Sequence, residues 1–244
     1  VQRCSGANNC SQSSDPNCLL NNCETEYKDC GLVGSVSCDE TFRCQQSCGQ
    51  NNMSCVENCP QRDIPATKQW NQVIACGQQA VSDGKCSSLT LDCLLQNCEM
   101  GWKNCGLTGS NGSSCKAVSD CQSKCGMNDD RCQIDCLFDS PAQTQKDLFA
   151  FNSCASNKCG NAQNQISCIL TNCKSSWETC GYTGMGGCGA ILSCQNQCPQ
   201  GDRACATNCL YEGNFQAQQD YVKLGECQST NCSGITDRTK LQQC

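Results

Sequence analysis

The segment CQSKCGMNDDRCQIDC, at residues 121–136, holds two C-x3-C pairs that are separated by six residues. Cysteine is frequent throughout: the chain of 244 residues contains 33 cysteines and no histidine. A cysteine share above roughly 8–10% is typical of a disulfide framework, because a small unit that lacks a large apolar core needs covalent cross-links. So many disulfides persist only in an oxidising environment. The sequence therefore predicts an exported protein that is extracellular or at the cell surface.

The chain contains an internal repeat. The segments CLLNNCETEYKDCGLVG, CLLQNCEMGWKNCGLTG and CILTNCKSSWETCGYTG begin at residues 18, 93 and 168, which are 75 residues apart both times. Cysteine, aromatic and glycine positions coincide in all three, and self-similarity at a fixed period indicates a tandem repeat. We predict three full repeats at 1–63, 64–139 and 140–212, followed by a partial fourth unit at 213–244.

The spacing within each repeat indicates helices. C-x3-C places two sulfurs one helical turn apart on the same face. Gly31, Gly106 and Gly181 each follow a cysteine at a position that fits a left-handed C-terminal cap. We therefore predict an all-α fold of tandem disulfide-stapled helical-hairpin repeats, with about four short helices in each ~75-residue unit, arranged as an elongated array.

Two C-x3-C helices that are joined by six residues form an antiparallel hairpin, in which the cysteines pair in a nested order. This local pattern, which occurs once in each full repeat, resembles the disulfide helical hairpins of α-hairpinin peptides and of small proteins imported into mitochondria. The resemblance implies a shape and no particular function. The predicted hairpin disulfides are Cys44–Cys59, Cys48–Cys55, Cys121–Cys136, Cys125–Cys132, Cys194–Cys209 and Cys198–Cys205.

The cysteines that precede each hairpin suggest a second nested pairing, and the remaining ones would close the glycine-rich loops. Sequence alone does not fix connectivity, so these pairs are hypotheses. The predicted upstream pairs are Cys4–Cys23, Cys10–Cys18, Cys76–Cys98, Cys86–Cys93, Cys154–Cys173 and Cys159–Cys168. The predicted loop-closing pairs are Cys30–Cys38, Cys105–Cys115 and Cys180–Cys188.

The partial fourth unit contains three cysteines. Nested pairing predicts Cys232–Cys244 and leaves Cys227 unpaired or intermolecular. Different surfaces at the two ends of an array make a head-to-tail contact, which builds filaments when the rotation does not close. We hypothesise a head-to-tail homopolymer in which Cys227 bridges chains. The alternatives are a differently paired tail, a buried free cysteine or a longer gene product, and a removed signal peptide is expected before Val1.

Catalytic, metal and nucleic-acid sites are not indicated. The absence of histidine removes the commonest general base, and no G-x-S-x-G or phosphate-binding loop occurs. Zinc sites favour C-x2-C spacing and histidine, which the chain lacks. There is no basic stripe with interleaved aromatics and no apolar stretch of roughly 20 residues. We predict a protein that is not an enzyme, with no metal, no cofactor, no nucleic-acid partner and no membrane span.

Four asparagines lie in N-x-S sequons and are candidate glycosylation sites if the chain passes through a eukaryotic secretory pathway. These residues are Asn9, Asn52, Asn111 and Asn231.

The segment CGAILSCQNQCPQGDRACATNCLYEGNFQAQQDYVKLGECQSTNC, at residues 188–232, resembles cysteine-rich exported proteins of myxobacteria and their relatives. That family pattern has two cysteine pairs around a GD-x-x-C turn, followed by a Tyr-x-x-Leu helix that ends in cysteines. The resemblance implies export and a disulfide-helical fold, and no activity. The matching residues are Gly201, Asp202, Cys205, Tyr221, Leu224 and Cys227.

These features favour an extracellular structural repeat protein, a subunit of a disulfide-stabilised surface fibre, filament or matrix, whose partner is a further copy of itself. The alternative is a secreted binding module, such as an inhibitor, toxin or adhesin on the same scaffold. A binding module predicts an exposed aromatic or basic loop cluster, and the glycine-rich loops offer only Tyr182 and Met185.

Overall fold

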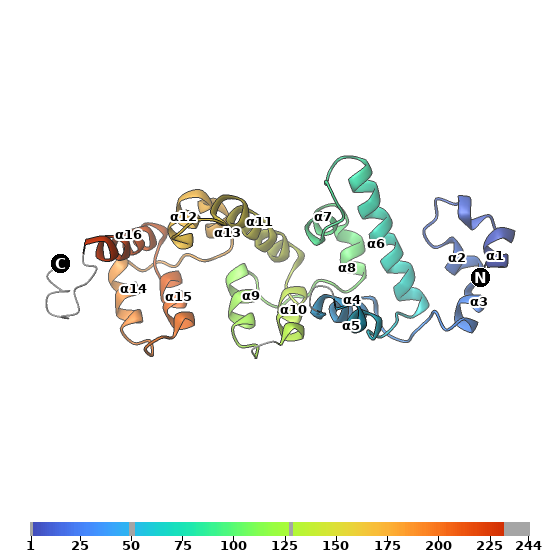
Figure 1. Ribbon diagram of the computed structural model, residues 1–244, viewed down its shortest axis with the longest axis horizontal. Coiled ribbons are helices and arrows are strands. Elements are labelled where there is room, and N and C mark those ends of the chain that lie inside the picture. Colours follow the sequence, from blue (N-terminus) through green and yellow to red (C-terminus); the bar gives the residue numbers. More distant parts are fainter. Residues whose placement is uncertain (1, 49–51, 127–128, 232–244) are drawn as a thin grey trace. The chain divides into compact units, whose positions relative to one another are not determined.

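The computed structural model of the chain describes residues 2–48, 52–126 and 129–231. Within these ranges the chain forms α-helices and one short 3-10 helix, without any strand (Figure 1). Paired cysteines join the helices to one another. The predicted all-α, disulfide-stapled fold is therefore confirmed.

The described part of each full repeat has five α-helices rather than about four, because one cysteine-flanked segment divides into two helices at Cys23, Cys98 or Cys173. The first repeat contains α1 (Gln2–Ala7), η1 (Cys10–Gln12), α2 (Cys18–Asn22), α3 (Glu24–Asp29), α4 (Cys38–Ser47) and α5 (Met53–Glu57). The second contains α6 (Ile64–Ser82), α7 (Leu91–Asn97), α8 (Glu99–Asn104), α9 (Cys115–Gln122) and α10 (Asp130–Phe138). The third contains α11 (Ala142–Cys159), α12 (Gln165–Asn172), α13 (Lys174–Thr179), α14 (Cys188–Gln195) and α15 (Arg203–Glu212), and α16 (Phe215–Asn231) follows it.

The chain divides into two compact units. The first consists of Val1–Ser113 and Ala117–Lys146, and the second of Ser114–Lys116 and Asp147–Cys244. These units cut the chain differently from the sequence repeats, because α9 and α11 each contribute residues to both. The division of the chain into three full repeats and a partial fourth unit stays a prediction from the sequence.

Each unit has its own small core in which aromatic rings take the central place. In the first unit, Phe42, Trp102 and Phe138 pack edge to face, with ring centroids 5.5–5.9 Å apart. Such pairs stabilise a fold beyond the area that they bury. The core of the second unit is built from Cys115, Leu170, Trp177, Cys180, Tyr182, Ile191, Leu210 and Ala217.

Local signals in the sequence set the helix ends. Gly31, Gly106 and Gly181 have φ angles of 65°, 77° and 73°, so the predicted left-handed caps are confirmed. In each hairpin a polar side chain caps the second helix by accepting a hydrogen bond from the backbone N–H of a cysteine. These caps are Asn52 to Cys55, Asp129 to Cys132 and Asp202 to Cys205.

The glycine-rich loops dock through their backbones. In the second unit, the N–H of Gly184 donates to the carbonyl of Gly213 at 2.9 Å, and the N–H of Gly186 donates to the carbonyl of Glu212 at 2.9 Å. A Cβ atom at Gly184 would lie 2.2 Å from the Glu212 oxygen. Only glycine therefore permits this close approach.

We expect Gly184→Ala to destabilise the second unit by about 1–3 kcal/mol, because the added methyl group overlaps backbone atoms that cannot move without breaking the docking. The control is Gly189→Ala in α14, where a Cβ atom meets nothing within 4 Å. Alanine there should be neutral or stabilise by up to about 1 kcal/mol. Thermal unfolding followed by circular dichroism measures both variants. Equal melting temperatures for the two would contradict the close-approach argument.

Candidate assembly site

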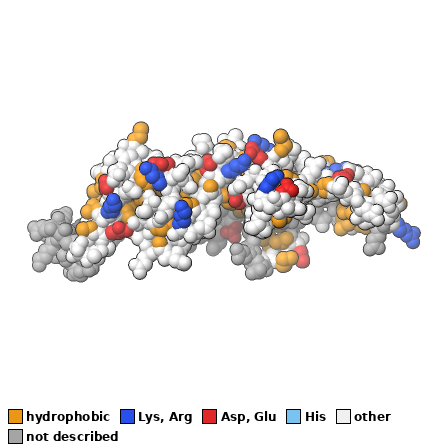
Figure 2. All heavy atoms as spheres, turned by 90° about the horizontal axis from the view of Figure 1, so that it is seen from above, with side chains coloured by type: hydrophobic (Ala, Val, Ile, Leu, Met, Phe, Trp, Pro, Cys, Tyr) orange, Lys and Arg blue, Asp and Glu red, His pale blue; other side chains and the backbone are white. Residues whose placement is uncertain are grey.

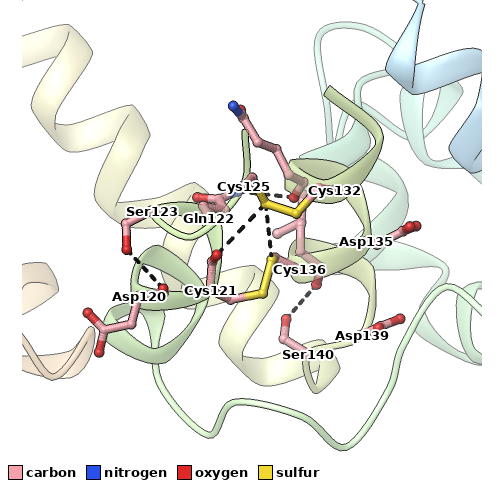
Figure 3. Close-up of a disulfide and its surroundings, with 12 residues drawn as sticks. Asp120, Cys121, Gln122, Ser123, Cys125, Cys132, Asp135, Cys136, Asp139 and Ser140 are labelled. Atoms are coloured by element: carbon pink, nitrogen blue, oxygen red, sulfur yellow. Dashed lines mark hydrogen bonds between the residues drawn. A yellow bond between two sulfur atoms is a disulfide. The ribbon is translucent and has the colours of Figure 1, made fainter. Parts of the chain in front are cut away.

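The disulfides within the helical hairpins form as their spacing predicts. In the second repeat, Cys121 pairs with Cys136 and Cys125 with Cys132, and Figure 3 shows the two bridges side by side. The upstream nested pairs form as well. The other pairs that match are Cys4–Cys23, Cys10–Cys18, Cys44–Cys59, Cys48–Cys55, Cys76–Cys98, Cys86–Cys93, Cys154–Cys173, Cys159–Cys168, Cys194–Cys209 and Cys198–Cys205.

The predicted disulfides that close the glycine-rich loops are wrong: these were Cys30–Cys38, Cys105–Cys115 and Cys180–Cys188. Instead, Cys38 pairs with Cys105 and Cys115 pairs with Cys180, with Cα atoms 5.1 and 4.6 Å apart. The physical reason lies in the loops, which dock on the segment that follows each hairpin. They therefore do not bring their flanking cysteines together. Each of these bridges joins one sequence repeat to the next.

The two bridges share one geometry. Cys38 and Cys115 are the first residues of α4 and α9. Cys105 is the C-cap of α8, and Cys180 is the C-cap of α13. A helix start in one repeat is thus bonded to a helix end in the following repeat.

Further contacts close the junction between the first two repeats. Phe42 lies one turn after Cys38 on α4, and its ring meets that of Trp102 at an angle of 77°. The next residue, Arg43, is buried, and its Nη1 donates to carboxylate oxygens of Asp135 and Asp139 at 3.1 and 2.8 Å. Charge-assisted hydrogen bonds of a buried guanidinium are stronger than neutral ones. A covalent bond, an aromatic contact and an ion-pair cluster therefore act at one junction.

The junction at Cys115–Cys180 lies within the second unit and is equally close. The backbone N–H of Lys116 donates to the carbonyl of Cys180 at 3.0 Å. A Cβ atom at Gly181 would lie 3.2 Å from the side chain of Ser114. Both bridging cysteines are fully buried. The helix-end glycine is therefore covered by the preceding repeat, as Gly106 is by Asp39.

Two buried glutamines, which the sequence analysis did not identify, hydrogen bond to Trp102 and Trp177. The indole Nε1–H of Trp102 donates to Oε1 of Gln145 at 3.0 Å, and Nε2 of Gln145 donates to the carbonyls of Leu107 and Ser140. In the second unit, Nε1–H of Trp177 donates to Oε1 of Gln218 at 2.9 Å. Buried polar groups of this kind specify one packing when every member is satisfied.

Three cysteines in the described part of the chain have no disulfide partner: Cys30, Cys188 and Cys227. Cys30 and Cys227 are exposed, and Cys188 is half-buried. The unpaired state of Cys227 agrees with its prediction, whereas Cys30 and Cys188 are free because their predicted bonds to Cys38 and Cys180 do not form. The predicted pair Cys232–Cys244 lies outside the described residues.

Some sulfurs lie close enough together to suggest a metal site. In each hairpin three sulfur atoms lie within 4.8 Å of one another, as in the set Cys125, Cys132 and Cys136. Two of the three sulfurs belong to one bridge, and the third belongs to the neighbouring bridge one turn away. A disulfide sulfur is not a thiolate, and only the thiolate is a good metal ligand. The clusters are therefore explained by neighbouring disulfides.

The pKa of one carboxyl group, that of Glu99, is strongly lowered. Glu99 on α8 lies between Lys103, at 2.6 Å, and Lys146. The hydrogen bonds and charges of these lysines lower the pKa of Glu99 to about 2. The group is on the surface, so its charge pairs are screened by water.

We expect Glu99→Gln to reduce the acid sensitivity of the first unit. A depressed carboxylate pKa stabilises the fold above the unfolded value of about 4.3, and this contribution is lost as the pH falls towards 2. Wild-type protein should therefore lose more thermal stability than the variant between pH 5 and pH 2, by roughly 1–2 °C. Glu57→Gln, on the exposed face of α5, is the control. Parallel melting profiles for wild type and Glu99→Gln would contradict the prediction.

The glycine-rich loop of the third repeat does not present an aromatic side chain. Tyr182 is buried in the core of the second unit, and Met185 is 97% exposed. A cavity of about 420 Å³ lies elsewhere in that unit, where Leu210, Tyr221 and Val222 line it. The hydroxyl of Tyr221 hydrogen bonds to Oε1 of Gln195 at its wall. The predicted loop cluster of a binding module is therefore reduced to one methionine, and this cavity is one candidate site for a ligand.

The surface carries interspersed charges. On the face that Figure 2 shows, the described lysine and arginine side chains lie singly among uncharged surface, several of them beside acidic side chains. The sequon residues Asn9, Asn52, Asn111 and Asn231 are all exposed. Glycan attachment at these residues stays a prediction, to which their exposure is no obstacle.

Among the described helices, none combines the length and apolarity needed to cross a bilayer. The extensive disulfide pairing is consistent with an extracellular location. Fold and bridges together define the class: an all-α, disulfide-rich, stable protein. Comparisons with protein-family models, with curated proteins and with solved structures find no match. The resemblance to myxobacterial cysteine-rich proteins stays a prediction.

Proposed function

We propose that the protein is an extracellular structural repeat protein, a subunit of a disulfide-stabilised surface fibre, filament or matrix. The observation that carries this proposal is the bridge from a helix start in one repeat to a helix end in the next, which occurs at both repeat junctions. A covalent bond at each junction resists separation of neighbouring repeats under load, whereas a small apolar interface does not. This property suits a protein that bears tension outside the cell.

The proposed role is not catalytic. Catalytic sites bring together several groups with perturbed pKa values in one cleft. Here the lowered pKa values of Glu24 and Glu99 each come from surface lysines that hydrogen bond to the carboxylate. Burial alone lowers the pKa of Arg62 to about 10. Among the described residues, these shifts therefore have structural causes.

A binding module is the second candidate, and the cavity in the second unit favours it. Its volume of about 420 Å³ lies within the range of roughly 300–1,000 Å³ that is common for ligand sites. Its apolar wall would suit a small apolar ligand. The two candidates differ in their expected state: a structural subunit assembles, whereas a binding module is a monomer with a bound partner.

Native protein should be analysed by non-reducing electrophoresis and negative-stain electron microscopy, with and without reductant. A structural subunit should give high-molecular-weight species and ordered assemblies. A sharp monomer band without any assembly would overturn the proposal. A monomer that copurifies with a small ligand, which Leu210→Trp displaces from the cavity, would establish the second candidate instead.

A further inference from the structure

Two unpaired cysteines, Cys30 and Cys188, occupy positions whose counterparts form the disulfides at the two junctions between full repeats. Cys30 is the C-cap of α3, just as Cys105 is the C-cap of α8. Cys188 is the first residue of α14, just as Cys38 is of α4. The chain therefore carries both halves of a third bridge of the same kind, one on each of two different helices.

The surface beside Cys30 is open where its counterpart is covered. Leu32 is 50% exposed, whereas Leu107, at the same position of the second repeat, is 0% exposed. Tyr27 is half-buried, whereas Trp102 is fully buried. A Cβ atom at Gly31 would meet nothing within 4 Å, although the equivalent glycines touch the preceding repeat. The helix end at Cys30 thus lacks the neighbour that covers the other two.

The surface beside Cys188 is open in the complementary way. Leu192 lies one turn after Cys188 on α14, at the position that Phe42 holds on α4. Phe42 is 3% exposed because it packs on the tryptophan of the following repeat, whereas Leu192 is 39% exposed. At the Cys115 junction the same position holds Ser119, so an apolar residue there is not obligatory. An exposed leucine beside a free cysteine is therefore the apolar half of an unfilled junction.

We propose that Cys188 of one copy forms a disulfide with Cys30 of a second copy, and that Leu192 then covers Tyr27 and Leu32 of that copy. This inference rests on the proposed structural function and specifies the contact through which two copies of the chain would join. The partner is a further copy of this chain, because the two open surfaces are complementary. At each junction a helix-start cysteine bonds to a helix-end cysteine, and Cys188 is the free helix-start cysteine while Cys30 is the free helix-end cysteine. A head-to-tail contact of this type propagates.

The bond forms by oxidation of two thiols. They lose two protons and two electrons as the S–S bond forms. A small-molecule disulfide such as oxidised glutathione accepts both and leaves as two thiols, through one mixed-disulfide intermediate.

Cys227 is not the bridging residue in this proposal, in contrast to the sequence hypothesis. Its sulfur accepts a hydrogen bond from the side-chain amide of Asn231 at 3.3 Å on the same helix. Its repeat counterparts Cys76 and Cys154 bond to Cys98 and Cys173 within a repeat rather than across a junction. Cys227 therefore occupies a position that pairs locally.

The test uses Cys30→Ser, Cys188→Ser and the control Cys227→Ser, each oxidised with a glutathione mixture and run without reductant. Wild type and Cys227→Ser should give a ladder of species. Cys30→Ser alone and Cys188→Ser alone should each migrate as a monomer, without the ladder. A mixture of Cys30→Ser and Cys188→Ser should give a dimer and nothing larger, because one chain supplies Cys188, the other supplies Cys30, and both remaining ends carry serine.

Mass spectrometry of the dimer should recover a peptide in which Cys30 is linked to Cys188. Recovery of that peptide from the monomer band, a Cys188–Cys188 dimer, or a ladder that survives both junction substitutions would overturn the inference. If the Cys30→Ser/Cys188→Ser double variant still assembles under the electron microscope, the structural function stands and only this junction fails. Wild-type protein that never assembles would remove both.

Discussion

Replacing Cys38 and Cys105 with alanine should lower the free energy of unfolding of the first unit by about 4 kcal/mol. The bridge spans 67 residues and therefore restricts the unfolded chain more than any hairpin bridge of 7 residues does. Other disulfides shorten the effective loop that it closes. The entropy depends on loop length only logarithmically, so the loss remains near that value.

A matched control is the removal of Cys86–Cys93, which spans 7 residues in the same unit. Its loss should be smaller, about 2.5 kcal/mol, because a short loop is easily closed in the unfolded chain. Urea unfolding followed by tryptophan fluorescence measures both variants. A loss for the short bridge that equals or exceeds that for the long bridge would show that native contacts, and not chain entropy, dominate the junction.

The hairpin disulfides could be predicted from the sequence because helix geometry alone decides them. A C-x3-C spacing fixes two sulfurs on one face, so Cys121 and Cys125 can meet their partners in only one nested order once a short turn joins the helices. The caps at Gly106 and Gly181 follow from the same local logic. Features that depend on fewer than about twenty consecutive residues could therefore be predicted from the spacing of cysteines and glycines.

The junction bridges could not be predicted in this way. Cys38 and Cys105 stand at helix ends, where spacing says nothing about which distant element lies opposite. Pairing across each loop and pairing across each junction both fit the repeat spacing, although pairing across the junctions leaves Cys30 and Cys188 unpaired. The choice depends on where the loop docks, and that is decided by a backbone approach at Gly109, where a Cβ atom would lie 2.1 Å from the Asp139 oxygen.

The glutamines were missed for a different reason, since a polar residue in a helix normally faces solvent. A signal did exist within the repeats. Gln145 and Gln218 each lie nine residues before a cysteine, and each follows a repeat in which the aromatic is tryptophan. Thr67 holds that position after the first repeat, in which the aromatic is Tyr27. The aromatic and the polar residue change together, which indicates contact.

Gln145→Ala should destabilise the first unit by about 3–5 kcal/mol, because it leaves the Trp102 indole N–H and the Leu107 carbonyl buried without partners, whereas the Ser140 carbonyl keeps the N–H of Gly109. Gln218→Ala should have a similar effect on the second unit, where Gln218 also donates to the carbonyls of Tyr182 and Leu210. Gln216→Ala is the control, because Gln216 is exposed on the same helix, two residues away. It should change stability by less than about 0.5 kcal/mol. Thermal melting, with near-ultraviolet circular dichroism of the tryptophans as a second probe, measures all three.

A double-mutant cycle separates the hydrogen bond from the packing around it. Trp102→Phe removes the indole donor, Gln145→Leu removes the acceptor, and the double variant removes both. If the indole N–H is buried and satisfied only by Gln145, Gln145→Leu alone should cost more than Gln145→Leu made in the Trp102→Phe background. The difference should be about 1–3 kcal/mol, the cost of leaving a buried donor without a partner. Additive losses would mean that water reaches the indole, and the glutamine would then act by filling space rather than by completing a buried polar network.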